Sequence, residues 1–394
     1  MLLYLSLSSI AFGEPPVQVF ILAGQSNMQG HAQVRTFEHI GLDPKSKPLL
    51  EMMTNPDGSP KVCGRVWISS IGCADAEQIG KLTAGYGASN NGPKIGPEFT
   101  FGLTVEKYLS GKILLIKTSW GGKSLNTDFR SPSAGPYEFN ANQLAQFEKQ
   151  GKDVAAMKAE KQKATGVNYK LMIDHVKAVT SDIKRVIPDY DPVVGYQLAG
   201  FVWFQGWNDM VDSSTYPNRD KPGGYDAYSH AMSHFIRDVR KDLNSPELPF
   251  VIGVLGVGGP TDRYNEDEQR YKSTHDNFRN AMAAPASLPE FQGNVTALRT
   301  EKYWDLELSG ARKKQEKIKA EAKKKAKEEK LNAQEEKLLT ERMLAEQLTE
   351  RERLVIETGI SNMEFHYLGS AKILGGIGQG LAEEMLKLNR VPLN

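Results

Sequence analysis

The stretch VFILAGQSNM, residues Val19–Met28, decides the fold. Its first five residues are mostly apolar and favour a β-strand, and they run directly into Gly24, Gln25 and Ser26. A buried strand that ends in Gly and a small hydroxyl residue is how an α/β sheet presents a nucleophile at its carboxyl edge. A Ser there can begin the next helix, where N–H groups and the helix dipole favour developing negative charge. Because a Ser in this place can also simply cap the helix, later segments must decide between the two interpretations.

Strand-like and helix-like runs alternate along the rest of the chain and predict an α/β fold. Strands are expected over residues 17–22, 112–117, 197–204 and 250–255, and helices over 99–109, 168–187, 225–243 and 367–388. Repeated βα units imply a three-layer α/β/α sandwich with a central parallel sheet. Because active sites in such sheets lie beyond the carboxyl ends of the strands, we expect three segments to gather on one edge: 25–26, 119–122 and 205–209.

Composition and the N-terminus narrow the class of protein. The chain has 394 residues and a formal net charge of +1, which argues against a nucleic-acid binder. Leu2–Phe12 is apolar, is too short to span a bilayer and precedes a small-x-small site, so residues 1–13 predict an export signal and a periplasmic or extracellular protein. No Lys or Arg precedes this run, and a buried first strand is the alternative. No other segment is apolar for long enough to be a membrane helix.

The chain contains two cysteines, Cys63 and Cys73. In an exported protein they predict a disulfide that closes a small loop. Without a nearby His pair they do not make a zinc site, and no metal is expected.

One segment does not fit the βα pattern. From Ala311 to Arg353 more than half of the residues are charged, and the segment contains neither Gly nor Pro. Its first half has almost no apolar stripe and predicts a solvated helix held by i,i+4 pairs, whereas the second half has enough Leu and Met to pack on something. Two interpretations stay open: an inert helical insertion, or a hairpin or coiled coil that contacts a protein or an anionic glycan.

Four blocks of sequence, in this order, resemble the SGNH (GDSL-like) hydrolases. They are GQSNM at 24–28, TSWGG at 118–122, WFQGWND at 203–209 and His366. The nearest branch is that of the sialate O-acetylesterases and carbohydrate acetylesterases. The resemblance covers most of Val17–Leu388 and implies one flavodoxin-like esterase domain over residues 14–394, interrupted by the charged insertion at about 309–353.

The resemblance implies a role for each block. Ser26 is the expected nucleophile, and His366 is the base that takes its proton and returns it to the leaving alcohol. The expected oxyanion donors are the Ser26 N–H, the N–H of Gly121 or Gly122, and the Asn208 side chain. Gln205 is expected at the same substrate-binding edge.

Two departures from the family pattern concern the triad and the third block. Trp207 stands where the family often has Glu, and the usual D-x-x-H is missing. Glu364, two residues before His366, could orient the imidazole as the third triad member; otherwise the enzyme would act through a Ser-His dyad. Asn362 is a weaker substitute, because an amide orients the ring but does not stabilise its charge.

Further candidates have alternative explanations. Glu98 could brace the site or only favour a helix N-terminus. His230 and His234 have metal-like spacing but sit on an ordinary amphipathic helix. Four aromatic residues could stack on a sugar or belong to the core: Trp120, Trp203, Phe204 and Trp207.

The sequence thus predicts an exported serine esterase that removes O-acetyl groups from carbohydrates without a cofactor. The carbohydrate part comes from the resemblance alone. The alternative is a carbohydrate-binding or scaffold protein on a decayed hydrolase fold, and a third possibility is an esterase for a non-sugar acyl ester.

Overall fold

The computed structural model describes residues 14–393, so the expected export signal over residues 1–13 lies outside them. Seven strands form one sheet in the order β4-β3-β6-β1-β7-β8-β9, parallel except for the edge strand β4. These strands are β1 (Val17–Gly24), β3 (Val66–Ile71), β4 (Gln78–Lys81), β6 (Ile113–Ser119), β7 (Tyr196–Phe204), β8 (Phe250–Val254) and β9 (Val295–Arg299). A short antiparallel pair, β2 (Ala32–Gln33) with β5 (Lys94–Ile95), lies beside the sheet.

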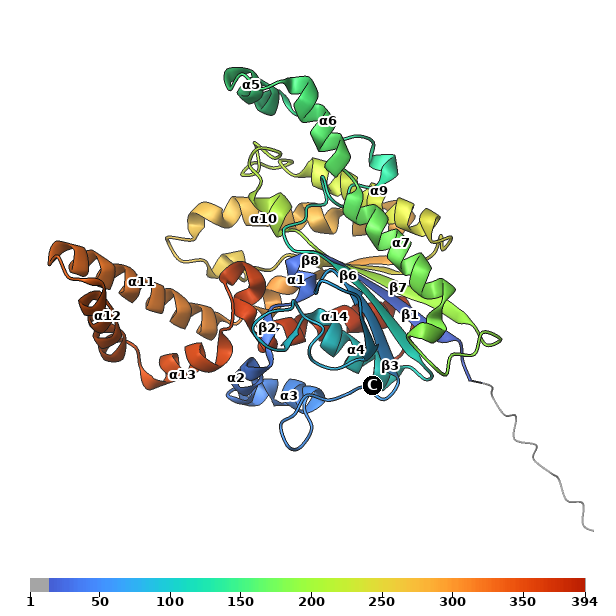
Figure 1. Ribbon diagram of the computed structural model, residues 1–394, viewed down its shortest axis with the longest axis horizontal. Helices are drawn as coiled ribbons and strands as arrows, with labels where there is room; N and C mark the ends of the chain where they lie inside the picture. Colours follow the sequence, from blue (N-terminus) through green and yellow to red (C-terminus); the bar gives the residue numbers. More distant parts are fainter. Residues whose placement is uncertain (1–13, 394) are drawn as a thin grey trace, which may run out of the picture.

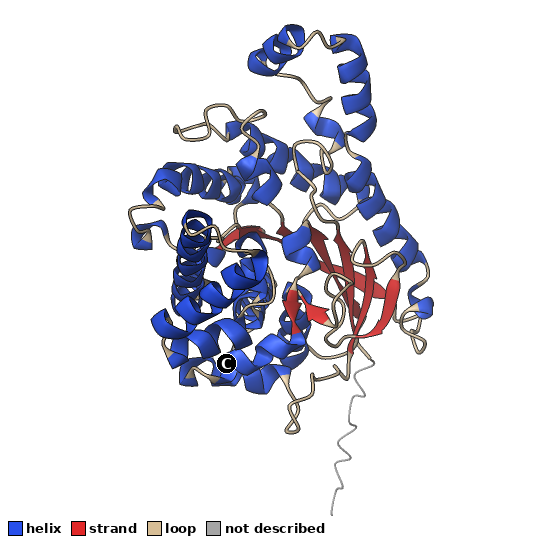
Figure 2. Ribbon diagram, turned by 60° about the vertical axis from the view of Figure 1, so that its left-hand side comes forward, coloured by secondary structure: helices blue, strands red, loops and turns tan. Residues whose placement is uncertain are grey.

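Helices cover both faces of this sheet, as Figures 1 and 2 show. The long ones are α4 (Pro97–Tyr108), α7 (Val167–Ser181), α9 (Asp226–Asp242), α10 (Gln269–Ala283) and α14 (Ala371–Leu388). Shorter ones are α1 (Ser26–Gln29), α2 (Phe37–Gly41), α3 (Lys47–Met53), α5 (Ala141–Lys149), α6 (Val154–Ala164) and α8 (Trp207–Val211). The predicted three-layer α/β arrangement is therefore confirmed.

Alternating side chains of the strands fill the two layers. On one face Phe20 of β1 meets Phe101 of α4, and Gly200 of β7 leaves room for Met385 of α14. On the other face Phe201 of β7 packs on Phe235 of α9. Because both faces are covered, the inner strands are buried along nearly their whole length, as parallel sheets require.

Strand register brings the three expected segments to one edge. Gly24, the last residue of β1, pairs with Ser119 at the end of β6 and with Phe204 at the end of β7. The chain leaves all three strands at the same level, so Ser26, the turn at Gly121 and helix α8 emerge side by side. The predicted convergence is confirmed.

Two expectations from the sequence are wrong. Cys63 and Cys73 are both free and buried, because Cys63 precedes β3 and Cys73 follows it, which puts the two thiols at opposite ends of one strand. The last helix begins at Ala371 rather than at 367, because Tyr367 and Leu368 take up left-handed backbone angles that end helical geometry.

The charged insertion forms three helices: α11 (Leu306–Glu328), α12 (Ala333–Gln347) and α13 (Glu350–Gly359). They extend away from the sheet in Figure 1. The first of them does carry an apolar stripe at i,i+4 spacing, formed by Ile318, Ala322 and Ala326, which packs on Leu339 and Met343 of α12. None of the described helices is long and apolar enough to cross a membrane.

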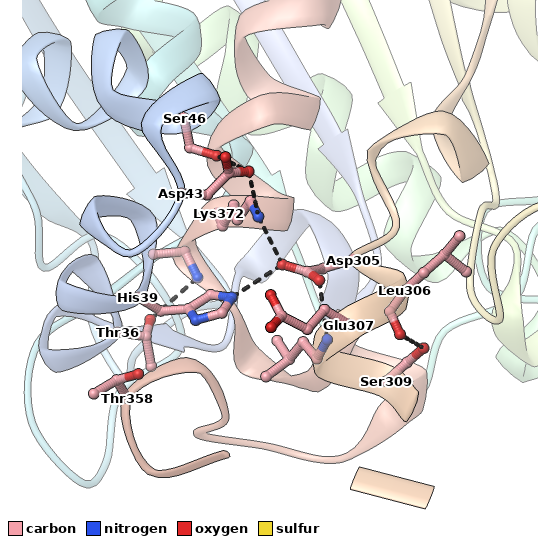
Figure 3. Close-up of polar contacts among 12 residues, drawn as sticks. Thr36, His39, Asp43, Ser46, Asp305, Leu306, Glu307, Ser309, Thr358 and Lys372 are labelled. Carbon is pink, nitrogen blue, oxygen red and sulfur yellow. Dashed lines mark hydrogen bonds and ion pairs between the residues drawn. The ribbon is translucent and has the colours of Figure 1, made fainter. Parts of the chain in front are cut away.

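A buried ionic cluster fixes the root of α11 (Figure 3). Asp305 caps the helix by accepting from the Leu308 N–H at 3.0 Å. Its Oδ2 lies 2.9 Å from His39 Nε2 on α2 and 2.9 Å from Lys372 Nζ on α14. Burial alone would raise the pKa of Asp305, but the hydrogen bonds from His39, Leu308 and Lys372 lower it overall. One carboxylate therefore joins the insertion to two helices of the sandwich.

Replacement of Asp305 by Asn is predicted to lower the free energy of unfolding by about 3 kcal/mol, because it removes one charge from a buried ion cluster. Since the folded-state pKa of Asp305 lies below its unfolded value, its contribution is present above about pH 4 and is lost as the pH falls. Denaturant unfolding of the wild-type and D305N proteins at pH 7 and at low pH tests both statements. Asp75→Asn, at an exposed site, is the control, and equal stability of D305N and wild type would contradict the prediction.

Candidate active site

The turn from β1 into α1 places Ser26 at the edge of the sheet. A Cβ on Gly24 would lie 2.1 Å from the Phe204 carbonyl oxygen, so only Gly lets β1 approach β7 there. The Gln25 side chain then joins two chain segments, because its Oε1 accepts from the N–H groups of Gly206 at 3.2 Å and Asn208 at 3.3 Å. Its Nε2 lies 3.4 Å from Ser26 Oγ. Gln25 thus holds the first residues of α8 next to the candidate nucleophile.

A fully buried ion pair contacts the last residue of α1. Lys117 of β6 and Glu98 of α4 are 2.7 Å apart, and both side chains are completely inaccessible. The same ammonium donates to the carbonyl of Gln29, the last residue of α1, at 2.8 Å and to that of Tyr86 at 2.8 Å. Glu98 also accepts from the Gly96 N–H at 2.9 Å. Glu98 therefore does brace the site, through Lys117.

Asp209 holds the loop that carries the glycine pair. This buried carboxylate accepts from the N–H groups of Leu125 at 2.8 Å and Asn126 at 3.1 Å. Burial raises its pKa to about 6, although these bonds and those from Gln205 and Tyr216 lower it in part. The Gln205 amide, predicted at the substrate-binding edge, donates to Asp209 and to the Lys123 carbonyl and so supports this loop.

The groups predicted as oxyanion donors remain open at this edge. Within residues 14–393, no protein hydrogen bond is formed by the N–H groups of Ser26, Gly121 and Gly122 or by the Asn208 side-chain amide. Gly122 has φ of +71° and open space where a Cβ would stand, whereas Gly121 faces the Gln29 side chain. Backbone N–H groups at a helix start and in a glycine turn are suited to stabilise a developing oxyanion.

A strained turn presents His366. Tyr367, Leu368 and Gly369 have φ values of 52°, 60° and 59°, an arrangement that is costly for the two non-glycine residues. The surrounding structure holds the turn: the Tyr367 hydroxyl accepts from the Gly256 N–H at 2.9 Å, and the Leu368 carbonyl accepts from the Ser361 N–H at 3.0 Å. This turn packs against α1, the helix that begins at Ser26.

The His366 ring is oriented by an amide and a second imidazole. Its Nδ1 lies 3.0 Å from Asn362 Oδ1, which assigns the proton to Nδ1 and leaves the Nε2 lone pair free. The His31 ring stacks on it, with centroids 3.8 Å apart and planes within 2°. Asn362 Nδ2 is 3.5 Å from His31 Nδ1, so one amide contacts both rings.

Burial and neighbouring charge keep both rings neutral. Burial, followed by the charge of Lys94, lowers the pKa of His366 to about 4. Burial and then the proximity of His366 lower the pKa of His31 to about 3. A neutral imidazole at neutral pH is the form that can accept a proton from a serine hydroxyl.

Glu364 occupies a different position from the one expected of a triad acid. Among the described residues it forms no hydrogen bond with His366, whose Nδ1 partner is Asn362. Desolvation raises the pKa of Glu364, which faces a neighbouring cleft. No hydrogen bond joins Ser26 Oγ to the His366 ring in the described part of the chain, although such contacts often shorten only when substrate binds.

The remaining candidate residues are the four aromatic side chains and the two histidines of α9, and some of them lie in the core and others at the surface. Trp203 and Phe204 are fully buried, so of the two alternatives for these residues the structure supports core packing. Trp207 faces a cleft instead, and Trp120 packs on Phe129. His230 and His234 contact each other at 3.1 Å on the surface of α9, and no group of three or more potential metal ligands exists within residues 14–393.

Comparison with known proteins identifies the class of this site. A model of the family described as carbohydrate esterase, sialic acid-specific acetylesterase, matches residues 16–295. The chain belongs to this family. It is therefore a carboxylic ester hydrolase of the carbohydrate O-acetylesterase type, as the sequence blocks predicted, and its substrate class is acetylated carbohydrate. The match ends before the insertion and His366.

Two solved structures that are similar to this esterase share little sequence with it. A protein from Arabidopsis thaliana is 18% identical, with a TM-score of 0.38, over 73% of this chain and 86% of its own. A carbohydrate acetylesterase from Xanthomonas citri is 12% identical, with a TM-score of 0.37, over 71% of this chain and 49% of its own. No curated protein matches the chain.

Three supporting residues of the esterase were not found from the sequence. His31 follows the GQSNM block closely, but stacking on a residue more than three hundred positions away leaves no local signal. The sequence around Lys117 indicates only a buried strand, and Asp209 is indicated only as the last residue of the WFQGWND block. A Lys inside an otherwise apolar strand was the one available hint, because a buried charge requires a partner.

Substitution of Asn362 tests its role through the pH profile. In the wild type, kcat/KM for p-nitrophenyl acetate is predicted to fall on the acid side near pH 4, where His366 takes up a proton. Asn362→Asp places a carboxylate beside the ring, favours its charged form and should move this limb about one pH unit or more to higher pH.

Asn362→Ala is the matched control for charge. Loss of one orienting hydrogen bond should lower kcat/KM about tenfold without an upward shift of the acid limb. An acid limb that stays in place in Asn362→Asp would show that Asn362 does not act on His366.

Proposed function

We propose that this esterase removes acetyl groups from carbohydrate hydroxyls through an acetyl-Ser26 intermediate. Ser26 Oγ attacks the acetyl carbonyl carbon while His366 Nε2 takes the hydroxyl proton. The bond from the carbonyl carbon to the sugar oxygen breaks, and the sugar oxygen receives that proton. His366 then takes a proton from water, whose oxygen attacks the acetyl carbonyl carbon. The bond from that carbon to Ser26 Oγ breaks, His366 returns the proton to Oγ, and the acetate leaves.

The observation that carries this proposal is the convergence of open groups around Ser26. One edge of the sheet holds a hydroxyl at a helix start and four donor groups that have no protein partner within residues 14–393, and the turn that carries the neutral His366 imidazole packs on the same helix. The donors are suited to the oxyanion of the tetrahedral intermediate, and each would contribute about 3 kcal/mol to its stabilisation. Asn362 takes the place of a triad acid, so the proposed machinery is Ser26 and His366, with an amide that orients the base.

Export stays a prediction from the apolar N-terminal run. The rival function is glycan binding without turnover, and it is favoured because no carboxylate of the described residues is hydrogen-bonded to the His366 ring. The family match argues against this rival, because the matched family is one of carbohydrate esterases.

The test is release of p-nitrophenol from its acetate by wild-type and Ser26→Ala protein. We expect the variant to lose at least about 10³-fold in kcat, because the step that it removes has no substitute in the site. Ser110→Ala, at an exposed site, is the matched control and should keep full activity.

A second readout follows the intermediate itself. Acid quenching during turnover, followed by peptide mass spectrometry, should find acetyl on the peptide that contains Ser26. Equal activity of wild type and Ser26→Ala would reject Ser26 as the nucleophile, whereas no activity in either protein would favour the glycan-binding protein.

A further inference from the structure

A second feature of the molecule is a large cleft beside the candidate active site. Its volume is about 1300 Å³, and it lies between α8, α10, α11 and the turn before His366. This exceeds the space that a single small ligand usually fills. Phe365 lines the cleft and its ring centroid lies 4.4 Å from that of His366, so the cleft begins next to the candidate base.

Aromatic side chains form part of the lining. Trp207 and Phe365 lie 5.7 Å apart with their planes 31° from parallel, at the end nearest Asn208 and His366. Tyr271 of α10 is 46% exposed and offers a ring further along. A sugar ring has an apolar face of C–H groups and an edge of hydroxyls, so a succession of accessible rings with polar groups between them matches a chain of sugars.

Charged groups without an ion-pair partner lie among these rings. Within residues 14–393, Lys317 forms no ion pair with a carboxylate, and Asp220 and Asp267 form none with a cation. The Arg270 guanidinium lies 4.7 Å from the centroid of the Tyr271 ring, and that ring also stacks with His275 at 6.0 Å. An unpaired cation donates hydrogen bonds and unpaired carboxylates accept them. Because both signs are present, the lining suits a polyhydroxylated ligand better than one with many like charges.

The wall on the far side of the cleft belongs to the insertion and is held in place. Lys313 of α11 pairs with Glu268 across the cleft, and Lys314 pairs with Glu352 of α13 at 2.8 Å. Asp305 fixes the base of the same helix in the sandwich (Figure 3). Since the family match ends at residue 295, this wall is supplied by a part of the chain outside the matched region.

We propose that this cleft binds the glycan chain that carries the acetyl group, with successive sugars between α10 and α11. The inference rests on the proposed function and narrows it: the substrate is an acetylated oligosaccharide or polysaccharide rather than a free sugar. The charged insertion then acts as a specificity element, which contacts the leaving-group side of the ester.

The experiment compares substrates of different length. Acetate release is measured from partly acetylated disaccharides and hexasaccharides of the xylo-, cello- and chito- series, beside p-nitrophenyl acetate. In the wild type, kcat/KM should be at least about tenfold higher for the hexasaccharide than for the disaccharide in one series. In Tyr271→Ala and Lys317→Ala, the ratio of kcat/KM for that hexasaccharide to kcat/KM for p-nitrophenyl acetate should fall about tenfold.

Lys327→Ala is the matched control, because Lys327 lies on the same helix, is exposed and does not line the cleft. It should behave as wild type with every substrate. Rates that do not depend on chain length in any series, or ratios unchanged in both cleft variants, would overturn the proposal.

A binding measurement separates this inference from the esterase mechanism. Calorimetry with the deacetylated hexasaccharides and Ser26→Ala protein should show binding that Tyr271→Ala and Lys317→Ala weaken. If no ester is hydrolysed but this binding is found, the proposed mechanism is wrong and the proposal that the cleft binds glycan is supported. If esters are hydrolysed but no hexasaccharide binds, the cleft proposal fails and the mechanism stands.

Discussion

The buried pair of Lys117 and Glu98 is the constraint on which the candidate site depends. An ammonium and a carboxylate without access to water are tolerated only when each is fully hydrogen-bonded. Here that requirement draws four segments together: β6, α4, the end of α1 and the chain at Tyr86. Because α1 is a single turn, it cannot hold its own position, and Lys117 provides the contact that fixes its last carbonyl below Ser26.

The same arrangement recurs around the site, where buried polar side chains hold short elements. Gln25 fixes α8 against α1, and Asp209 fixes the glycine turn against α8. The strained turn at Tyr367 is held through its hydroxyl. Each donor that would face the oxyanion therefore sits on a rigid support, and such preorganisation allows hydrogen bonds to stabilise a transition state without reorganisation. The candidate base, His366, is held differently from these donors. The Asn362 amide and the stacked His31 ring set its orientation, while burial and the nearby Lys94 keep it neutral.

The insertion shows how a charged segment can become a fixed structural element. Its ion pairs on the surface contribute little individually. The stripe of Ile318, Ala322 and Ala326 and the buried carboxylate of Asp305 hold it in place. Lysines of α11 then line the cleft beside the candidate site. A family of esterases with a shared sheet can in this way vary the outer wall of its site without changing the elements that position the nucleophile.

The sequence by itself determined the parallel sheet, the position of Ser26 after β1 and the meeting of three segments at one edge, because strand periodicity and the rule for parallel sheets are local properties. Tertiary structure alone decided which side chains act together. It decided that His31 stacks on His366 and that Asn362, not Glu364, contacts the His366 ring. It also decided that Cys63 and Cys73 stay free. Each outcome depends on distances between residues that are far apart in the chain or that are separated by a whole strand. Neither propensity nor spacing encodes such distances, so the packing of the completed fold decides them.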